Sequence, residues 1–331
     1  MMVMKSLGRR LGQAAMGSAL ALALGLPVQA ETPIRVAMGD IASVETLGLL
    51  IAMERTKERG VPMELTYFNS EDVATQAVVG GQADIGVGSP YAFIQNSQAP
   101  LRMFYRMSTL LFFPVVNTDH YKSWADLDGQ EVTVHSRGSG TEALMRLMED
   151  IHGIKYSAIS YVPGSEVRAG AMLQGTVKAS IVDSSGFRLL TEKGEGKFER
   201  LPLDGVNATD EALYGNQDFL NAREDDVAVF VAELLRTWEE INANPGVVAE
   251  LREQYDLLAD LPAEAVADIT PYYEAAAKNG VMPNGGGEAK DVADDLAFLA
   301  AAGQVKAAEG EVDSAAYWDF DLLSKAKTPA Q

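Results

Sequence analysis

Short β-prone runs alternate with amphipathic stretches along much of the chain, and this alternation predicts a βα rhythm. The run Ile34 to Met38 is the first predicted strand, a polar loop follows from Gly39 to Glu45, and a helical spacing of apolar positions extends from Thr46 to about Arg59. Strands separated by helices in this way are typical of parallel βαβ units. The pattern therefore predicts an α/β fold.

The rhythm continues and then resumes after an interval, which predicts a second α/β lobe. Further strands are predicted at residues 63–68, 83–88, 131–135 and 157–162, and further helices at 70–80, at 141–152 and from 165 onward. After Asn221 the pattern is mainly helical, with predicted helices at 227–242, 245–258 and, last, 288–302. We expect this helical region to pack back on the first lobe.

Two stretches align without a gap: Ala77–Ser89 and Ala171–Asp183. Each runs from helix through a glycine turn into a strand, with Gly81 matching Gly175. The alignment suggests two similarly built lobes, each presenting one strand end. A chance likeness between two helix–turn–strand units is the alternative.

Composition narrows the function classes. The 331 residues are 47% hydrophobic and 22% charged, which is typical of a folded globular protein rather than a disordered one. A formal charge of −20 disfavours nucleic-acid binding. With 0 Cys and only 3 scattered His, thiolate chemistry is excluded, and neither an HExxH motif nor paired metal-ligand spacing is present. We expect no metal and no cofactor.

The first thirty residues have the composition of a secretory signal peptide. Lys5, Arg9 and Arg10 precede an apolar stretch from Ala14 to Leu26, and Val28-Gln29-Ala30 offers small residues for cleavage. We expect cleavage after Ala30, which leaves 24 basic residues (27 − 3) against 47 acidic ones, a net charge of −23. An uncleaved anchor is the alternative. Because no Cys follows and no later segment reaches the about 20 apolar residues of a membrane span, the sequence predicts an unanchored periplasmic protein.

The segment at residues 135–142, between a predicted strand and a predicted helix, contains the strongest candidates for ligand binding. Free backbone N–H groups at a helix start, glycines, hydroxyls and one guanidinium together predict an anion pocket. The candidate residues are Arg137, Gly138, Ser139, Gly140 and Thr141. The alternative is that Ser139 or Thr141 only caps the helix and that Arg137 is a surface charge. The spacing fits neither a P-loop nor a dinucleotide fingerprint.

Four other residues follow predicted strands, where open α/β sheets place their ligands. Ser89 and Tyr91 follow the third strand, Ser43 lies in the first loop, and Asp183 ends the second repeat. Their oxygens would complete the hydrogen bonds of a bound solute, although Ser43, Ser89 and Asp183 are equally suited to capping helices. No GxSxG elbow and no Ser/His/Asp order is present, so we predict no catalytic residues and no enzyme.

The ordered segments resemble one family: the periplasmic solute-binding proteins of ABC importers, in the group that binds sulfonates, taurine, nitrate or thiamine-pyrimidine precursors. The resemblance rests on IRVAMGDIASVE, VVGGQADIGVGSPYAFIQ, SWADLDGQEVTVHSRGSGTEALMRLM, AMLQGTVKASIVDSSGF and DFLNAREDDVAVFVAELLRTWEEINANPGVVAEL. It implies a type II binding-protein fold, with two α/β lobes joined by two crossover strands and the ligand held between them. The implied divisions are a signal peptide at 1–30, lobe one at 31–115, lobe two at 116–205, and a return to lobe one at 206–331.

The resemblance also implies how the site is assembled and what it serves. Ser43, Ser89 and Tyr91 would face the cleft from lobe one, and Arg137 to Thr141 with Asp183 from lobe two. In the family an acid and alanines usually follow the second glycine turn, whereas this chain has Lys178-Ala179-Ser180. This difference affects which residues near Asp183 face the ligand. We therefore expect a monomeric receptor that captures a small organic or inorganic anion for an inner-membrane permease. The expected ligand is a sulfonate, a carboxylate or a related nitrogen compound.

Three alternatives stay open. The GSGTE segment is also similar to solute receptors of tripartite transporters. An extracytoplasmic sensor and a secreted enzyme on the same scaffold are the others.

Overall fold

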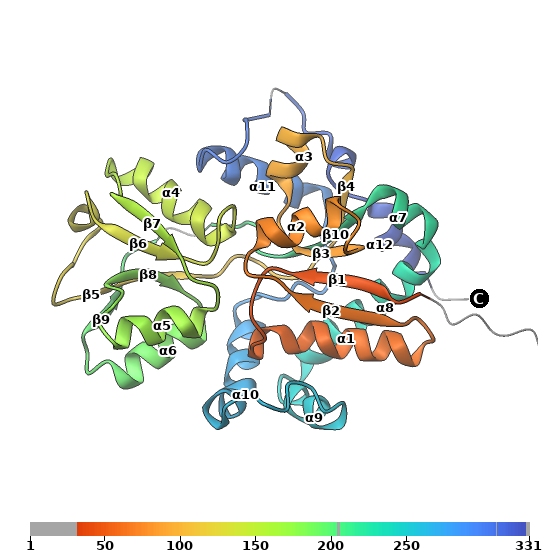
Figure 1. Cartoon of the computed structure of the whole chain (residues 1–331), viewed down its shortest axis with the longest axis horizontal. Helices are drawn as coiled ribbons and strands as arrows, with labels where there is room; N and C mark the ends of the chain where they lie inside the picture. Colours follow the sequence, from red (N-terminus) through yellow and green to blue (C-terminus); the bar gives the residue numbers. More distant parts are fainter. Residues whose placement is uncertain (1–31, 204–205, 309, 329–331) are drawn as a thin grey trace, which may run out of the picture. The chain divides into compact units, whose positions relative to one another are not determined.

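The computed structural model describes residues 32–203, 206–308 and 310–328, so the predicted signal peptide lies outside the described residues. The chain from Thr32 onward forms one compact unit that contains two five-stranded sheets, both visible in Figure 1. We call the part built on the first sheet lobe one and the part built on the second lobe two. An α/β fold with two lobes is thus confirmed.

The sheet of lobe one has the strand order β2-β1-β3-β10-β4. Its strands are β1 (Ile34–Met38), β2 (Met63–Tyr67), β3 (Ile85–Gly88), β4 (Leu101–Arg106) and β10 (Ala212–Asn216). The first three strands are parallel because helices connect them, whereas β10 enters antiparallel between β3 and β4. The connecting elements are η1 (Val44–Thr46), α1 (Leu47–Glu58), α2 (Glu71–Val79) and α3 (Tyr91–Ser97).

The sheet of lobe two has the order β7-β6-β8-β5-β9. Its strands are β5 (Phe113–Asn117), β6 (Glu131–Val134), β7 (Ala158–Tyr161), β8 (Ala179–Val182) and β9 (Phe198–Arg200). Its helices are η2 (Trp124–Leu127), α4 (Gly140–His152), α5 (Ser165–Leu173) and α6 (Ser184–Lys193). Because β5 already begins at Phe113, the change of sheet precedes residue 115, where the sequence placed the first lobe limit.

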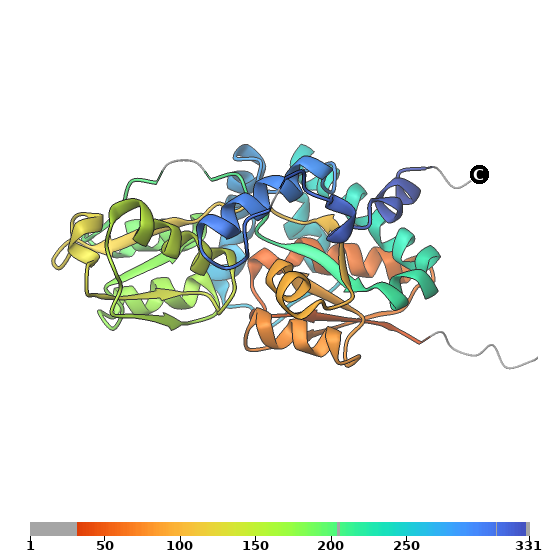
Figure 2. The same cartoon turned by 90° about the horizontal axis from the view of Figure 1, so that it is seen from above.

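Two crossover segments join the lobes and lie side by side. Thr109 pairs with Thr209 in an antiparallel bridge, the Leu110 N–H donates to the Ala208 carbonyl at 2.8 Å, and the Asp210 N–H donates to the Ser108 carbonyl at 3.0 Å. Figure 2 shows both segments passing between the sheets. Two short paired connections of this kind are suited to act as a hinge.

The aligned stretches fold alike. In lobe one, α2, a glycine turn and β3 follow each other, and in lobe two α5, a glycine turn and β8 do the same. Gly81 and Gly175 both adopt positive φ, at +72° and +74°, a conformation that glycine takes at no steric cost. The equivalence drawn from the sequence therefore extends to the backbone.

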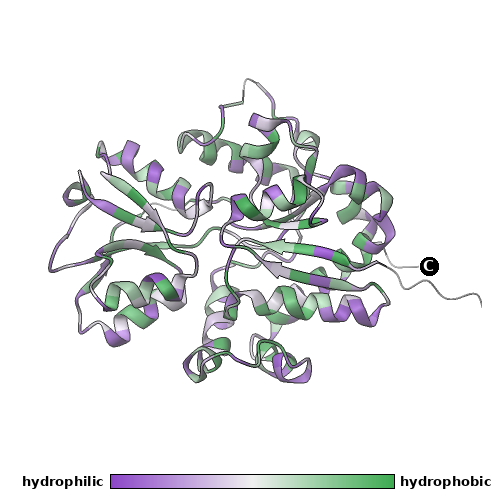
Figure 3. Ribbon diagram, in the orientation of Figure 1, coloured by the Kyte–Doolittle hydropathy of each residue, from purple (hydrophilic) through white to green (hydrophobic). Residues whose placement is uncertain are grey.

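The C-terminal helices cover lobe one. They are α7 (Gln217–Ala222), α8 (Glu224–Ala243), α9 (Val247–Gln254), α10 (Ala263–Lys278), α11 (Ala289–Ala301), η3 (Ser314–Ala316) and α12 (Phe320–Ala326). Phe230, Leu234 and Trp238 of α8 are buried in one core with Leu49 and Ile51 of α1, and Figure 3 shows hydrophobic and hydrophilic stretches alternating along these helices. The sequence pattern ended the helices at 302 and missed α12. No helix among the described residues is long and apolar enough to cross a membrane.

Candidate functional site

A large cavity of about 630 Å³ lies between the lobes. Lobe one contributes the loop before η1 and helix α10, and lobe two contributes α5 and α6. Both polar and apolar side chains line it: Ala42, Ser43, Val44, Glu45, Glu166, Asp183, Ser185, Gly186, Arg188, Leu189, Glu192, Lys193, Leu261, Pro262, Glu264, Ala265, Ala267, Asp268, Pro271 and Tyr272. Contributions from two lobes around one cavity are typical of a ligand site at a domain interface.

A second, small cavity of about 30 Å³ lies at the crossover segments and shares Glu45 with the large one. It is lined by Asp40, Glu45, Glu71, Phe112, His135, Ser139, Thr141, Ser165, Arg168, Asp210 and Glu211. Asp40 follows β1, Glu71 begins α2, and Asp210 and Glu211 belong to the returning crossover. The carboxyl ends of the strands and the start of α4 thus meet here, where α/β sheets place ligands.

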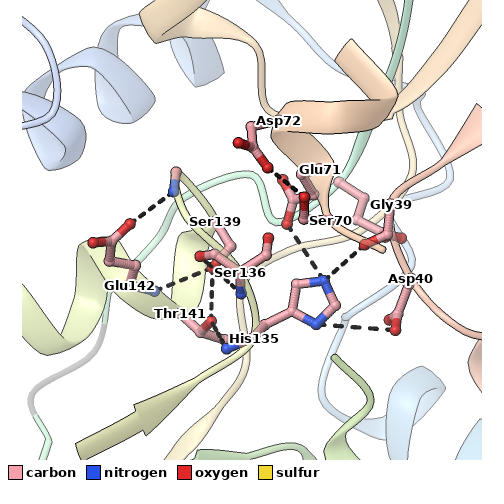
Figure 4. Close-up of polar contacts among 12 residues, drawn as sticks. Gly39, Asp40, Ser70, Glu71, Asp72, His135, Ser136, Ser139, Thr141 and Glu142 are labelled. Atoms are coloured by element: carbon pink, nitrogen blue, oxygen red, sulfur yellow. Dashed lines mark hydrogen bonds and ion pairs between the residues drawn. The ribbon is translucent and has the colours of Figure 1, made fainter. Parts of the chain in front are cut away.

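His135 connects the lobes at the small cavity, as Figure 4 shows. Its Nε2 lies 3.1 Å from the Gly39 carbonyl, to which it donates, and 3.9 Å from Glu71 Oε1, while Nδ1 lies 3.9 Å from Asp40 Oδ1. Burial lowers the pKa of His135 below its usual value even though Asp40 opposes the shift. The ring is therefore a neutral donor between the lobes at pH 7.

The loop before α4 satisfies most of its own hydrogen bonds. The Ser139 hydroxyl donates to the Ser136 carbonyl at 2.8 Å and accepts from the Glu142 N–H at 3.3 Å, while the Gly138 N–H donates to the Glu142 carboxylate at 2.7 Å. Thr141 Oγ1 accepts from the His135 N–H at 3.1 Å. The capping alternative thus holds for Ser139, the N-cap of α4, whereas Thr141 lies inside the helix, and both residues line the small cavity.

The other predicted members of this loop lie elsewhere. Arg137 is exposed, with its guanidinium 5.2 Å from the centre of the Tyr161 ring, and it lines neither cavity. Gly138 turns the chain at φ +81°. Gly140 lets the helix start approach the crossover, since a Cβ there would lie 2.8 Å from Leu110 Cδ1 and 3.3 Å from Asp210 Oδ1. Helix α5 instead contributes a buried guanidinium to the wall of the small cavity.

Arg168 of α5 carries that guanidinium, and the sequence analysis did not single it out. The side chain is 1% exposed, its Nε donates to the Ile181 carbonyl and its Nη1 to the Val162 carbonyl, both at 2.8 Å. Among the described residues Nη2 has no hydrogen bond and the guanidinium makes no ion pair, although Arg168 lines the small cavity. Its spacing of three residues from Ser165 on one helix face was the available signal.

The carboxylates around the small cavity are held in an unfavourable electrostatic environment. Burial, followed by the charge of Asp210, raises the pKa of Glu71 to about 8, and burial followed by Asp40 raises that of Asp210 to about 7. The pKa values of Glu45 and Glu211 are also raised well above their usual range, first by burial and then by neighbouring acids. Crowded acids with few cations favour protonation or the arrival of a positive charge.

Ser43 and Asp183 line the large cavity. Ser43 precedes η1 in a capping box with Thr46. Asp183 Oδ1 accepts from the Gly186 N–H and the Ser165 hydroxyl, both at 2.7 Å, so it caps α6 while standing in the cavity wall. Both residues therefore have the capping role, and both also reach the site.

Ser89 and Tyr91 line neither cavity. The Ser89 backbone donates a hydrogen bond to Glu71, so Ser89 supports a residue of the small cavity. Tyr91 is 0% exposed, and its hydroxyl donates to Asp295 at 2.7 Å and accepts from Trp318 Nε1 at 3.0 Å. The prediction that Tyr91 faces the cleft is therefore wrong. Tyr91 is buried in the core against α11 and the segment before α12.

Ion pairs between α6 and α10 bridge the lobes at the large cavity. Arg188 pairs with Asp268, which also accepts from the Ser185 hydroxyl at 2.5 Å, and Lys193 Nζ lies 2.9 Å from Glu264 Oε2. These charges come from opposite lobes, so they hold the cavity closed. The described residues contain no group of three or more His, Cys, Asp or Glu side chains suited to hold a metal ion.

Comparison with solved structures identifies the class of fold. A Bordetella bronchiseptica RB50 protein of known structure matches with a TM-score of 0.70 at 21% identity, covering 89% of this chain and 97% of that one. The alkanesulfonate-binding protein SsuA of Xanthomonas axonopodis pv. citri, bound to MOPS, matches with a TM-score of 0.63 at 17% identity, covering 87% and 99%. The periplasmic nitrate-binding protein NrtA of Synechocystis PCC 6803 matches with a TM-score of 0.63 at 12% identity, covering 89% and 88%.

The fold is therefore that of periplasmic binding proteins, as the sequence resemblance implied. The profile of the family described as NMT1/THI5 like matches residues 45–247, and the chain belongs to this family. A comparison with curated protein sequences finds no match.

Proposed function

We propose that this protein is the periplasmic substrate-binding component of an ABC importer and that it captures a small anionic solute between its lobes. Support comes from the two-lobed fold, the paired crossover segments and the cavities lined from both lobes. The solved relatives named above include a sulfonate-binding and a nitrate-binding protein. Closure of lobes about a hinge is the general mechanism by which such folds trap a ligand.

One observation carries the anionic part of the proposal. Arg168 is buried in the wall of the small cavity, two backbone carbonyls fix its orientation, and Nη2 is left without a partner. A buried guanidinium costs several kcal/mol of desolvation unless a charge compensates it. A ligand carboxylate or sulfonate at Nη2 provides that compensation through a charge-assisted hydrogen bond.

Cellular location and partners follow from the sequence. The segment 1–30 has the features of a cleavable signal peptide, and no Cys is present to carry a lipid. A freely diffusing receptor would hand its solute to an inner-membrane permease. We propose that it does so as a monomer.

Rival functions make different demands on the site. A sensor or a tripartite-transporter receptor would bind the solute in the same way and deliver it to another membrane partner. A secreted enzyme would need a nucleophile or an acid–base pair acting on the ligand, and turnover of a bound compound would be its signature.

A thermal-shift screen of residues 31–331 tests the proposal. The panel contains sulfonates, carboxylates, nitrate, amino acids and pyrimidines, because a ligand bound only by the native state raises the Tm. We expect at least one anion to raise the Tm, and we expect Arg168→Gln, but not the exposed control Arg59→Gln, to abolish that shift. A panel without any anionic hit, or a hit unaffected by Arg168→Gln, contradicts the proposal.

A further inference from the structure

We infer that the captured solute carries a positively charged nitrogen as well as its anionic group, so that the ligand is a small zwitterion. Its anion binds Arg168 of lobe two, and its cation binds the carboxylates of Asp40, Glu71 and Asp210 in the same small cavity. This inference rests on the proposed function and names the class of solute that the site selects.

The small cavity has an excess of acidic side chains without a basic partner. Five carboxylates line it, namely Asp40, Glu45, Glu71, Asp210 and Glu211. Among the described residues none of the five forms an ion pair with a Lys or an Arg, and the histidine near Asp40 and Glu71 stands 3.9 Å from each. Elsewhere in the chain acids pair readily, as Arg106 with Asp291 and Arg55 with Glu240, both at 2.5 Å. The cavity is distinguished by having five carboxylates without a Lys or Arg partner gathered in one place.

Arg168 is a second and independent observation in the same place. It shares the cavity with five acids, yet its hydrogen bonds go to the Ile181 and Val162 carbonyls and not to a carboxylate. These bonds direct Nε and Nη1 to backbone carbonyls, and although the Arg168 charge lowers the pKa of Asp210, the guanidinium forms no ion pair with any of the five acids. A cavity with separate basic and acidic groups is complementary to a ligand whose own anionic and cationic groups are separate.

The origins of the groups agree with this assignment. Asp40, Glu71 and Asp210 come from lobe one and its returning crossover, whereas Arg168 comes from lobe two. A zwitterion would therefore be held by one lobe through its cation and by the other through its anion. Lobe closure around such a ligand completes both interactions at once, which makes each end of the ligand necessary for tight binding.

The dimensions and the neighbouring surface also fit. A volume of about 30 Å³ admits small charged groups and little more. Phe112 also lines the cavity and is the aromatic residue there. Through Glu45 the small cavity adjoins the large one, whose wall includes Leu189, Pro262 and Tyr272, so the rest of the ligand has an apolar region to occupy.

Matched pairs of compounds test the inference by calorimetry on residues 31–331. Each pair differs only in its amine: β-alanine and propionate, γ-aminobutyrate and butyrate, taurine and ethanesulfonate. We expect the aminated member of at least one pair to bind about 10- to 100-fold more tightly than its partner, because a charge-assisted interaction is worth about 1.5–3 kcal/mol. Propylamine, which has the cation alone, is expected to bind as weakly as the bare anions.

Variants locate the two ends of the ligand. Glu71→Gln is expected to remove the preference for the aminated member, and Arg168→Gln is expected to weaken both members. Glu131→Gln, at an exposed carboxylate, is the matched control. Asp210→Asn tests the same preference for the aminated member. If one of the two acid variants fails to fold, the other still gives the result.

The outcomes separate the inference from the proposed function. Bare anions that bind as tightly as their aminated partners, with dependence on Arg168, overturn the zwitterion and leave the anion receptor intact. Propylamine that binds as tightly as the aminated anions, without dependence on Arg168, overturns both. Binding of Ca²⁺ that Glu71→Gln abolishes assigns the acids to a metal and also overturns the inference, as does a complete absence of binding to all seven compounds.

Discussion

The two cavities between the lobes use their charges in opposite ways. At the large cavity Arg188 meets Asp268 and Lys193 meets Glu264, so cations and anions from facing lobes neutralise each other. At the small cavity Arg168 and five carboxylates stand together without one ion pair among them. Charges that are paired across the lobes stabilise the closed arrangement, whereas charges that are left unpaired and buried are available to a ligand.

The largest effect is expected from Arg168→Met. This change removes the donors to the Ile181 and Val162 carbonyls, and each buried acceptor left unsatisfied costs about 1–3 kcal/mol. We expect the free energy of unfolding to fall by about 2–4 kcal/mol in urea titrations. Arg168→Lys, which retains a donor and the charge, is the matched comparison and should lose less. Equal stability of wild type and Arg168→Met would show that the carbonyl contacts contribute nothing.

Next in size is a loss of stability as the pH rises through neutrality. The pKa of Glu71 is raised to about 8 and that of Asp210 to about 7, so both groups favour folding while protonated, and their contribution is lost as the pH rises through these values. His135, whose pKa is lowered, titrates in the opposite sense below its usual range and does not interfere above pH 7. We expect the Tm of the ligand-free protein to fall between about pH 6.5 and pH 8 and to level off above that range, because both states are then ionised.

The double variant Glu71→Gln with Asp210→Asn is the control for that pH dependence. Because the amides cannot ionise, its Tm should change less over the same range, as measured by scanning calorimetry. A Tm that falls equally in the double variant would assign the dependence to other groups. A bound zwitterion should also flatten the curve, since its cation stabilises the ionised carboxylates.

A smaller effect is expected from Arg188→Gln at the large cavity. The Arg188 and Asp268 side chains are 29% and 26% exposed, so the pair contributes no more than about 1 kcal/mol. Because it bridges the lobes, its loss should accelerate ligand release by up to about fivefold and leave the association rate unchanged. Stopped-flow measurement of the association and release rates tests this prediction, and a slower association would contradict the bridging role.

The smallest effect is expected from Lys193→Gln. Its partner Glu264 is 83% exposed, and solvent-exposed pairs contribute about 0.5 kcal/mol or less. We expect ligand affinity and Tm to stay within experimental error of wild type. If Lys193→Gln changed ligand release as much as Arg188→Gln does, the exposed pair would contribute more to lobe closure than an exposed ion pair is expected to.

The sequence predicted the regular elements of the βα units well, because their signals are local. The strand at 34–38 was placed correctly at both ends, and Ser70 was identified as the cap of α2. The relation between Gly81 and Gly175 was also visible, since a positive φ selects glycine directly. The later elements α10 and α12 were given no range, because Pro271 lies inside α10 and because α12, with 7 residues, is too short to show a clear period.

Predicted site residues from three segments line a cavity, with Ser43 and Asp183 at the large one and the start of α4 at the small one. Ser139 and Thr141 reach the small cavity, because the start of α4 follows a strand of the sheet. Arg137 is in the same segment, but its side chain leaves toward Tyr161 on the surface. The charge pattern of the cavity could not be predicted, since Glu71, Arg168 and Asp210 are brought together from three distant segments.

The most direct test is a crystal structure of residues 31–331 with the tightest-binding anion from the screen. The account predicts ligand oxygens within hydrogen-bond distance of Arg168 Nη2 and, where the ligand has an amine, its nitrogen within the same distance of Asp40, Glu71 or Asp210. A ligand held at Arg137, or one confined to the large cavity without contact to Arg168, would contradict the account.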